Sequence, residues 1–140
     1  MKKILVGLDE SRQSHKALDY AINLGKKFKS RIFVLSVAGF PAMDVSNNLM
    51  RPYMEDNTEL FKALHKNALN KLKKAGIKGE AFLFFGLPYE SIIAFSDKQK
   101  MDLIVLGKHG KGLEAGVESF LVGSTSKIVS ERAKAPVLLV

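Results

Sequence analysis

Cysteine is absent from this chain of 140 residues. Disulfide bonds and thiolate chemistry are therefore excluded, and the composition fits a reducing compartment. Long hydrophobic runs are also missing, because no apolar stretch approaches the roughly 18 residues that cross a bilayer. The apolar run after Met1-Lys2-Lys3 is too short for the core of a signal peptide. We therefore expect a cytoplasmic protein with no membrane partner.

Several common catalytic motifs are missing as well. The sequence has no Walker A pattern and no serine in a G-x-S-x-G elbow. No pair of acids is placed for general acid–base work, so no catalytic residue is predicted. The three histidines lack the spacing of metal ligands, so no metal site is predicted. We expect His15 and His65 on helices facing solvent, and His109 in a glycine-rich loop, where a plain loop residue is favoured over a phosphate contact.

Positive charge exceeds negative charge, and the formal net charge is +8. The lysines and arginines are spread along the chain, with the densest groups at residues 26–31 and 71–78. Each group falls at the predicted end of a helix, where cations interact favourably with the helix dipole. This location favours solvated helix ends over a nucleic-acid surface, so nucleic acid is not the expected partner.

Apolar runs alternate with amphipathic stretches along the chain. The runs are typical of strands buried on both faces, and the stretches show the period of helices. This alternation predicts a single α/β domain over residues 1–140, with an open parallel sheet and helices on both faces. A long loop is predicted from Gly39 to about Arg51. The expected strands are 3–8, 31–37, 80–85, 103–106 and 135–140; the expected helices are 11–28 (capped by Ser11 or Ser14), 52–75, 88 through at least 95, and 124–133.

The stretch from Met101 to Val129 is the most informative part of the sequence. It contains an apolar strand, a glycine-rich loop, and the helix start Gly123-Ser124-Thr125. A helix N-terminus behind such a loop presents free N–H groups and is a natural anion site. This stretch therefore predicts a cradle for nucleotide phosphates. The alternative interpretation is a glycine-rich connection with capping serines and no ligand. Asp9 follows the first strand, where it can bind a ligand at the sheet edge or cap the first helix.

Four segments together resemble the universal stress protein family over essentially the whole chain. They are Ile4–Ser11, Gly86-x-Pro88-x-Glu90-x-Ile92, Asp102–Gly107 and Ala135–Val140. The resemblance implies a five-stranded parallel sheet of order 3-2-1-4-5, like that of the adenine nucleotide alpha hydrolases. It also implies a homodimer through the C-terminal strand.

Some family members bind ATP through the motif G-x2-G-x9-G-(S/T), and others lack the motif and do not bind ATP. Gly107-x2-Gly110 and Gly123-Ser124 match the two ends, but twelve residues separate Gly110 from Gly123 here. By resemblance, Asp9 contacts the ribose or adenine and Val37 contacts adenine. The expected phosphate contacts are Gly107, Gly110, Gly123, Ser124 and Thr125.

The function predicted from this resemblance is regulatory. We expect a domain that binds ATP, with Mg²⁺, or a related adenine nucleotide, and that hydrolyses ATP slowly at most. The longer spacer favours an alternative, a nucleotide-free dimeric interaction module of the same family. An enzyme of the wider adenine-nucleotide-binding α/β group is disfavoured, because HIGH-type and SGG-x-DS-type signatures are missing.

Overall fold

A parallel β-sheet organises the part of the chain that the computed structural model describes, which is residues 1–39, 47–109 and 123–140. Within these residues the sheet has five strands in the order β3-β2-β1-β4-β5, and every neighbouring pair is parallel. The expected fold class and strand order are confirmed. The strands are β1 (Lys3–Gly7), β2 (Arg31–Ala38), β3 (Gly79–Phe85), β4 (Leu103–Leu106) and β5 (Val137–Leu139).

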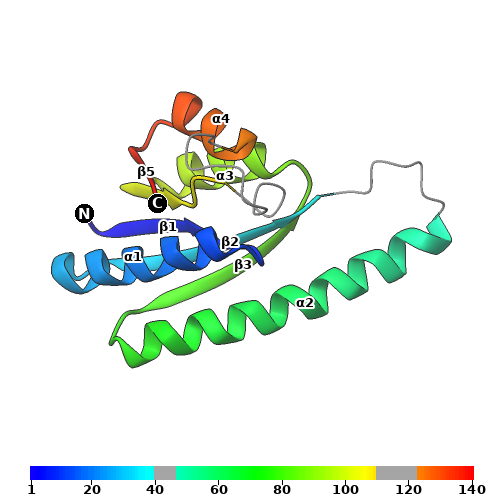
Figure 1. Cartoon of the computed structure of the whole chain (residues 1–140), viewed down its shortest axis with the longest axis horizontal. Coiled ribbons are helices and arrows are strands. Elements are labelled where there is room, and N and C mark those ends of the chain that lie inside the picture. The colour runs from blue at the N-terminus through cyan, green and yellow to red at the C-terminus, as the bar shows by residue number, and fades with distance from the viewer. Residues whose placement is uncertain (40–46, 110–122) are drawn as a thin grey trace.

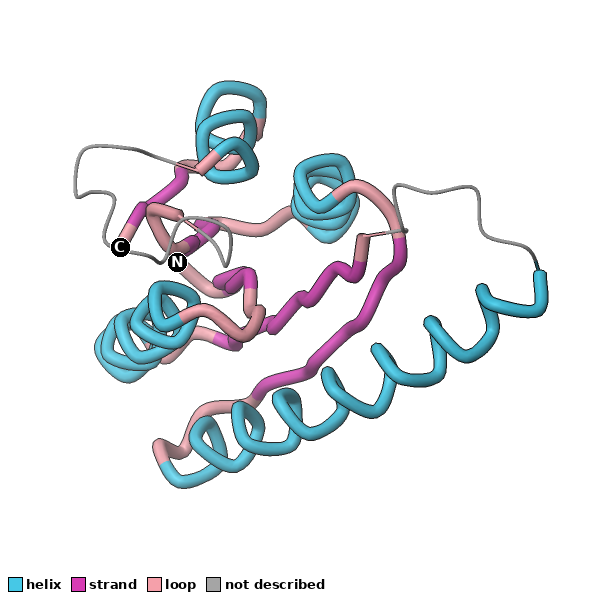
Figure 2. Tube along the Cα trace, turned by 45° about the vertical axis from the view of Figure 1, so that its right-hand side comes forward, coloured by secondary structure: helices cyan, strands magenta, loops and turns pink. Residues whose placement is uncertain are grey.

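Helices cover both faces of the sheet (Figures 1 and 2). One face carries α1 and α2, and the other carries α3 and α4. Each helix connects two parallel strands, so its N-terminus lies at the carboxyl edge of the sheet, where ligands bind in open α/β folds. The helices are α1 (Arg12–Phe28), α2 (Asn47–Lys74), α3 (Pro88–Gln99) and α4 (Ser124–Arg132).

Strand β1 lies at the centre of two hydrophobic layers. Ile4 and Val6 pack in the layer under α1 and α2, whereas Leu5 packs in the layer under α3 and α4. All three side chains are fully buried. Successive side chains of a strand point to opposite faces, so a strand covered on both sides must be apolar throughout. This explains the unbroken apolar run that begins the sequence.

Helix α2 differs most from the sequence prediction. The predicted loop from Gly39 to Arg51 was wrong at its end, because α2 begins at Asn47 and contains Pro52; residues 40–46 lie outside the described part. Pro52 is the sixth residue of α2, beyond the first four N–H groups that have no intrahelical partner, so it removes one helical hydrogen bond. The helix nevertheless extends on both sides of Pro52. Figure 1 shows the N-terminal half of α2 projecting beyond the sheet.

The last strand is shorter than expected, but its pairing extends beyond its assigned ends. The N–H of Ile104 donates to the carbonyl of Pro136, and the N–H of Val140 donates to the carbonyl of Leu106, each at 2.9 Å. The C-terminal residues therefore continue along β4 almost as far as the sequence predicted. None of the helices in the described ranges is long and apolar enough to cross a membrane.

Candidate functional site

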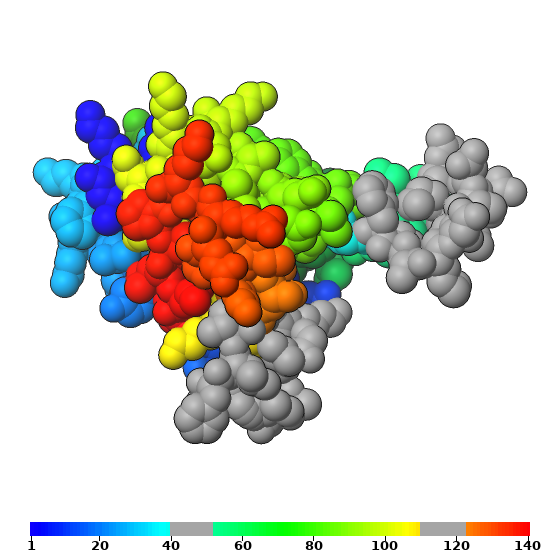
Figure 3. Space-filling model, turned by 90° about the horizontal axis from the view of Figure 1, so that it is seen from above, coloured from blue at the N-terminus to red at the C-terminus, as the bar shows by residue number. Residues whose placement is uncertain are grey.

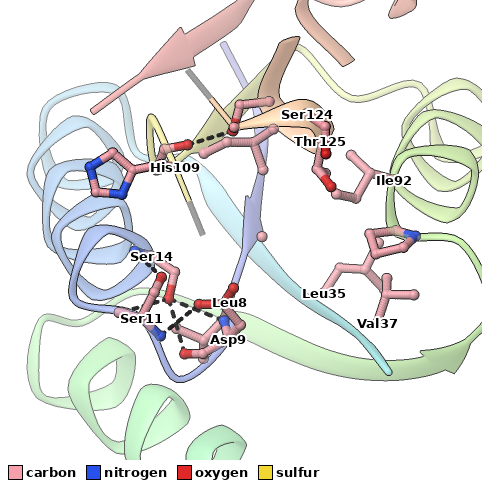
Figure 4. A pocket seen from close by; sticks show the side chains of 16 residues that line it. Leu8, Asp9, Ser11, Ser14, Leu35, Val37, Ile92, His109, Ser124 and Thr125 are labelled. Carbon is pink, nitrogen blue, oxygen red and sulfur yellow. Dashed lines mark hydrogen bonds between the residues drawn. The ribbon is translucent and has the colours of Figure 1, made fainter. Parts of the chain in front are cut away.

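A cavity of about 540 Å³ opens at the carboxyl edge of the sheet, above β1, β2 and β4. Its walls come from the strand ends and from α1, α3 and α4 (Figure 4). The strand ends supply Gly7, Leu8, Asp9, Leu35, Val37, Leu106, Gly107 and His109; α3 supplies Pro88 and Ile92; α4 supplies Ser124, Thr125 and Ser126 after Gly123; and the start of α1 supplies Ser11 and Ser14.

The structure brings most of the predicted site residues together around this cavity. Asp9 and Val37 come from the ends of β1 and β2, and the others come from the end of β4 and the start of α4. Gly110 lies outside the described residues. That these residues bind a nucleotide stays a prediction. The lining includes Asp9, Val37, Gly107, Gly123, Ser124 and Thr125.

A tight turn holds Asp9 at the mouth of the cavity. Its Oδ1 accepts a hydrogen bond from the N–H of Ser11 at 2.7 Å. Ser11, not Asp9, is the N-cap of α1, because its Oγ accepts from the N–H of Ser14 at 3.2 Å. The alternative of Asp9 as the helix cap was therefore wrong. A carboxylate has about four acceptor positions, so Asp9 can accept a further hydrogen bond from a ligand.

The start of α4 forms the opposite wall. Its N-cap is Gly123, which offers no side-chain oxygen to the first turn. The first N–H groups of a helix have no intrahelical partner, and the helix dipole makes this end partly positive. The hydroxyls of Ser124 and Thr125 stand beside these donors at the cavity wall. This end of the cavity is chemically suited to a phosphate.

The end of β4 is tied to the start of α4 by two hydrogen bonds. The N–H of Gly123 donates to the carbonyl of Lys108 at 2.7 Å. The hydroxyl of Ser126 donates to the carbonyl of Gly107 at 2.6 Å. The two ends of the glycine-rich motif therefore meet in space, although many residues separate them in the sequence.

Gly107 also lies directly against the first turn of α1. A Cβ at this position would lie 2.7 Å from Cβ of Gln13 and 2.9 Å from its backbone carbonyl carbon. Contacts this short with backbone require one of the elements to move. Gly107 thus allows α1 to begin close to the cavity, which is a packing reason for the glycine beside the predicted phosphate contact.

We expect Gly107→Ala to destabilise the protein by about 1–3 kcal/mol, because overpacking forces the backbone of α1 away from β4. Urea unfolding measures the change. Gly39→Ala is the matched control, since among the described residues a Cβ there meets only the carbonyl oxygen of Gly86, at 4.0 Å, and it should leave the midpoint nearly unchanged. Equal effects of the two substitutions would contradict the packing argument.

One helical histidine contacts a buried serine instead of facing solvent, and the loop histidine lies at the cavity. His109 lines the cavity, and its Nδ1 is buried without a hydrogen-bond partner among the described residues. His65 is half-buried, so its predicted position facing solvent was wrong. Its Nε2 lies 2.8 Å from the hydroxyl oxygen of Ser36, on β2. A signal was present: His65 is four residues after Phe61 and three before Ala68, two buried residues on the apolar face of α2.

Burial lowers the pKa of His65 below its ordinary value of 6.5. The unfolded chain therefore binds a proton at this residue more readily than the folded chain, and stability should fall as the pH drops below about 6.5. We expect His65→Gln to lose less stability than the wild type between neutral and mildly acid pH. Urea titrations at several pH values measure the difference, and parallel curves for the two proteins would show the inference to be wrong.

Comparison with known proteins identifies the family. A model of the universal stress protein family matches residues 1–140. Universal stress protein MJ0531 of Methanocaldococcus jannaschii is 35% identical over 146 residues, covering 99% of this chain and 81% of that protein. The chain belongs to the universal stress protein family.

Solved structures support the same assignment. The structure of MJ0577 from M. jannaschii has a TM-score of 0.86 and 27% identity, covering 99% of this chain and 94% of that one. A universal stress protein solved in complex with cAMP has a TM-score of 0.72 and 26% identity, covering 99% and 95%. The fold expected from the sequence is thus the fold of this family.

Proposed function

We propose that this universal stress protein binds an adenine nucleotide in the cavity at the carboxyl edge of its sheet. The observation that carries the proposal is geometric. One cavity joins the carboxylate of Asp9, which has further acceptor positions, to a helix N-terminus without a side-chain cap, at Gly123. The family relative in complex with cAMP supports an adenine nucleotide as the ligand class.

The two ends of the cavity suit the two ends of a nucleotide. Leu35, Val37 and Ile92 provide apolar surface for a base, and pockets for small molecules combine such surface with a few placed polar groups. Asp9 can accept a hydrogen bond from a ribose hydroxyl or from the adenine amine. The phosphates would lie at the start of α4, against the backbone of Gly123 and the hydroxyls of Ser124 and Thr125.

The role we propose is regulatory and cytoplasmic, with ATP hydrolysis slow at most. Asp9 is the single carboxylate among the described residues that line the cavity, and it is held by Ser11. General acid–base catalysis commonly uses a group positioned to take a proton from the attacking water. Asp9 instead lies at the end of the cavity away from α4, beside the proposed ribose.

Calorimetry with ATP and with cAMP, each with and without Mg²⁺, tests the proposal. We expect binding by the wild type, and binding about tenfold weaker or more for Asp9→Ala, which loses hydrogen bonds to a charged acceptor. Asp19→Ala is the matched control, because Asp19 is an exposed carboxylate of α1 that pairs with Lys71 at 3.1 Å, outside the cavity lining.

Absence of heat with either ligand at high micromolar concentration would refute nucleotide binding. The alternative of a nucleotide-free interaction module would then be favoured. Equal losses of nucleotide affinity for Asp9→Ala and Asp19→Ala would instead show that the nucleotide does not bind in this cavity.

We further propose a homodimer through β5. Within the described ranges β5 pairs with β4 alone, so its other edge carries backbone groups that a second copy can pair with. Pro136 and Val140 use their backbone groups toward β4. Because strand residues alternate, the N–H groups of Val137 and Leu139 point away from β4. Figure 3 shows the last residues of the chain (red) at the surface beside α4 (orange).

Light scattering should give twice the chain mass of 15.5 kDa at micromolar concentration. Amide hydrogen exchange adds a residue-level readout. We expect the amides of Val137 and Leu139 to exchange more slowly in the dimer than after dilution to the monomer, because pairing protects them. The amide of Leu138, which faces β4, is the internal control. A dimer in which Val137 and Leu139 stay unprotected would use another surface.

A further inference from the structure

A chain of hydrogen bonds connects α2 to the end of β1, just behind the cavity. Nε2 of His65 lies 2.8 Å from Oγ of Ser36, and Oγ of Ser36 donates to the carbonyl oxygen of Leu8 at 2.6 Å. Ser36 is 1% exposed. Neither Ser36 nor His65 lines the cavity, although Leu8 does. The network therefore connects two residues outside the cavity lining to Leu8, which is part of the lining.

The chemistry of the partners determines the direction of each hydrogen bond. A carbonyl oxygen can only accept, so the hydroxyl proton of Ser36 is directed to Leu8. The hydroxyl oxygen must then accept from His65, which places a proton on Nε2. Burial lowers the pKa of His65, so the neutral form with this single proton is favoured at neutral pH. His65 thus holds Ser36 in its role as donor to Leu8.

The peptide between Leu8 and Asp9 is held on both sides. Its carbonyl, from Leu8, accepts from Ser36, and its N–H, from Asp9, donates to the hydroxyl of Ser14 at 3.1 Å. The N–H of Leu8 donates to the carbonyl of Leu35 at 2.9 Å. With both sides of the peptide held, the direction in which the Asp9 side chain leaves the backbone is also held.

We propose that Ser36 and His65 are positioning residues for Asp9, which they orient toward the base and ribose end of a bound nucleotide. The inference rests on the proposed function for the role of Asp9. It assigns to α2 a part in ligand affinity, although α2 contributes no residue to the described cavity lining. A buried hydroxyl, when removed, leaves both of its partners without a hydrogen bond, so the effect on the Leu8–Asp9 peptide should be large.

The first test measures affinity for ATP and cAMP by calorimetry. We expect Ser36→Ala to bind about tenfold more weakly, the loss that corresponds to one hydrogen bond. Ser30→Ala is the matched control: Ser30 is 4% exposed, and its hydroxyl donates to the carbonyl of Met1 at 2.9 Å, at the opposite end of the sheet. It removes a comparable buried hydrogen bond and should leave affinity unchanged. Equal losses for the two variants would overturn the proposal.

A double-mutant cycle separates positioning from general destabilisation. If Ser36 acts through Asp9, Ser36→Ala should cost less than about twofold in a protein that already carries Asp9→Ala. Full additivity of the two losses would overturn the proposal. His65→Gln keeps an N–H donor for Ser36 and should bind nearly as well as the wild type, whereas His65→Leu removes the donor and should bind more weakly. Equal affinities for these two variants would remove His65 from the network.

A ligand-free measurement keeps this inference distinct from the proposed function. Amide exchange of Leu8 and Asp9 should be faster in Ser36→Ala than in Ser30→Ala, because the peptide is no longer held by its carbonyl. Failure of the wild type to bind ATP or cAMP would refute the proposed function alone. Unchanged exchange at both amides in Ser36→Ala would refute the positioning role, whatever the calorimetry shows.

Discussion

The structure depends on the complete burial of β1. This strand is covered by helices on both faces and paired on both edges, to β2 and to β4. A strand in this position has little freedom to shift, since any change in register would expose its apolar side chains or break two ladders. The chain therefore turns at a defined position after β1, and Asp9 lies in this turn. A ligand site next to such a strand is built on a fully buried element that is paired on both edges.

Much of this arrangement could be read from the sequence because the relevant signals are local. The apolar run at residues 4–6 predicted a doubly buried strand, and the glycine followed by hydroxyl residues at Gly123 predicted a helix start. Parallel topology then places both features at the same edge of the sheet. That Asp9 and the start of α4 border the same cavity follows from these two signals, and the family resemblance adds the strand order.

The network behind Asp9 could not be predicted in the same way. Ser36 interrupts the apolar run that follows Arg31 in β2, which alone indicates only a small buried residue. Its partners are the carbonyl of Leu8, 28 residues away, and the ring of His65, 29 residues away. Such contacts depend on how α2 crosses the sheet, and periodicity does not give that crossing. The same is true of Gly107, whose closeness to Gln13 is a contact between separate elements.

The length of the segment between Gly110 and Gly123 was the main sequence argument against a nucleotide site, and the structure weakens it. What a phosphate would contact is the backbone at the two ends of the motif. Two hydrogen bonds hold those ends together: the N–H of Gly123 donates to the carbonyl of Lys108, and the hydroxyl of Ser126 donates to the carbonyl of Gly107. Neither hydrogen bond involves the residues between the two ends.

Lengthening a closed loop from nine to twelve residues costs on the order of 0.3 kcal/mol in closure entropy, less than one of these hydrogen bonds contributes. The three additional residues can therefore be accommodated while the two ends stay in place. The number of residues between the glycines is therefore weak evidence against a phosphate cradle, because hydrogen bonds join the two ends of the motif.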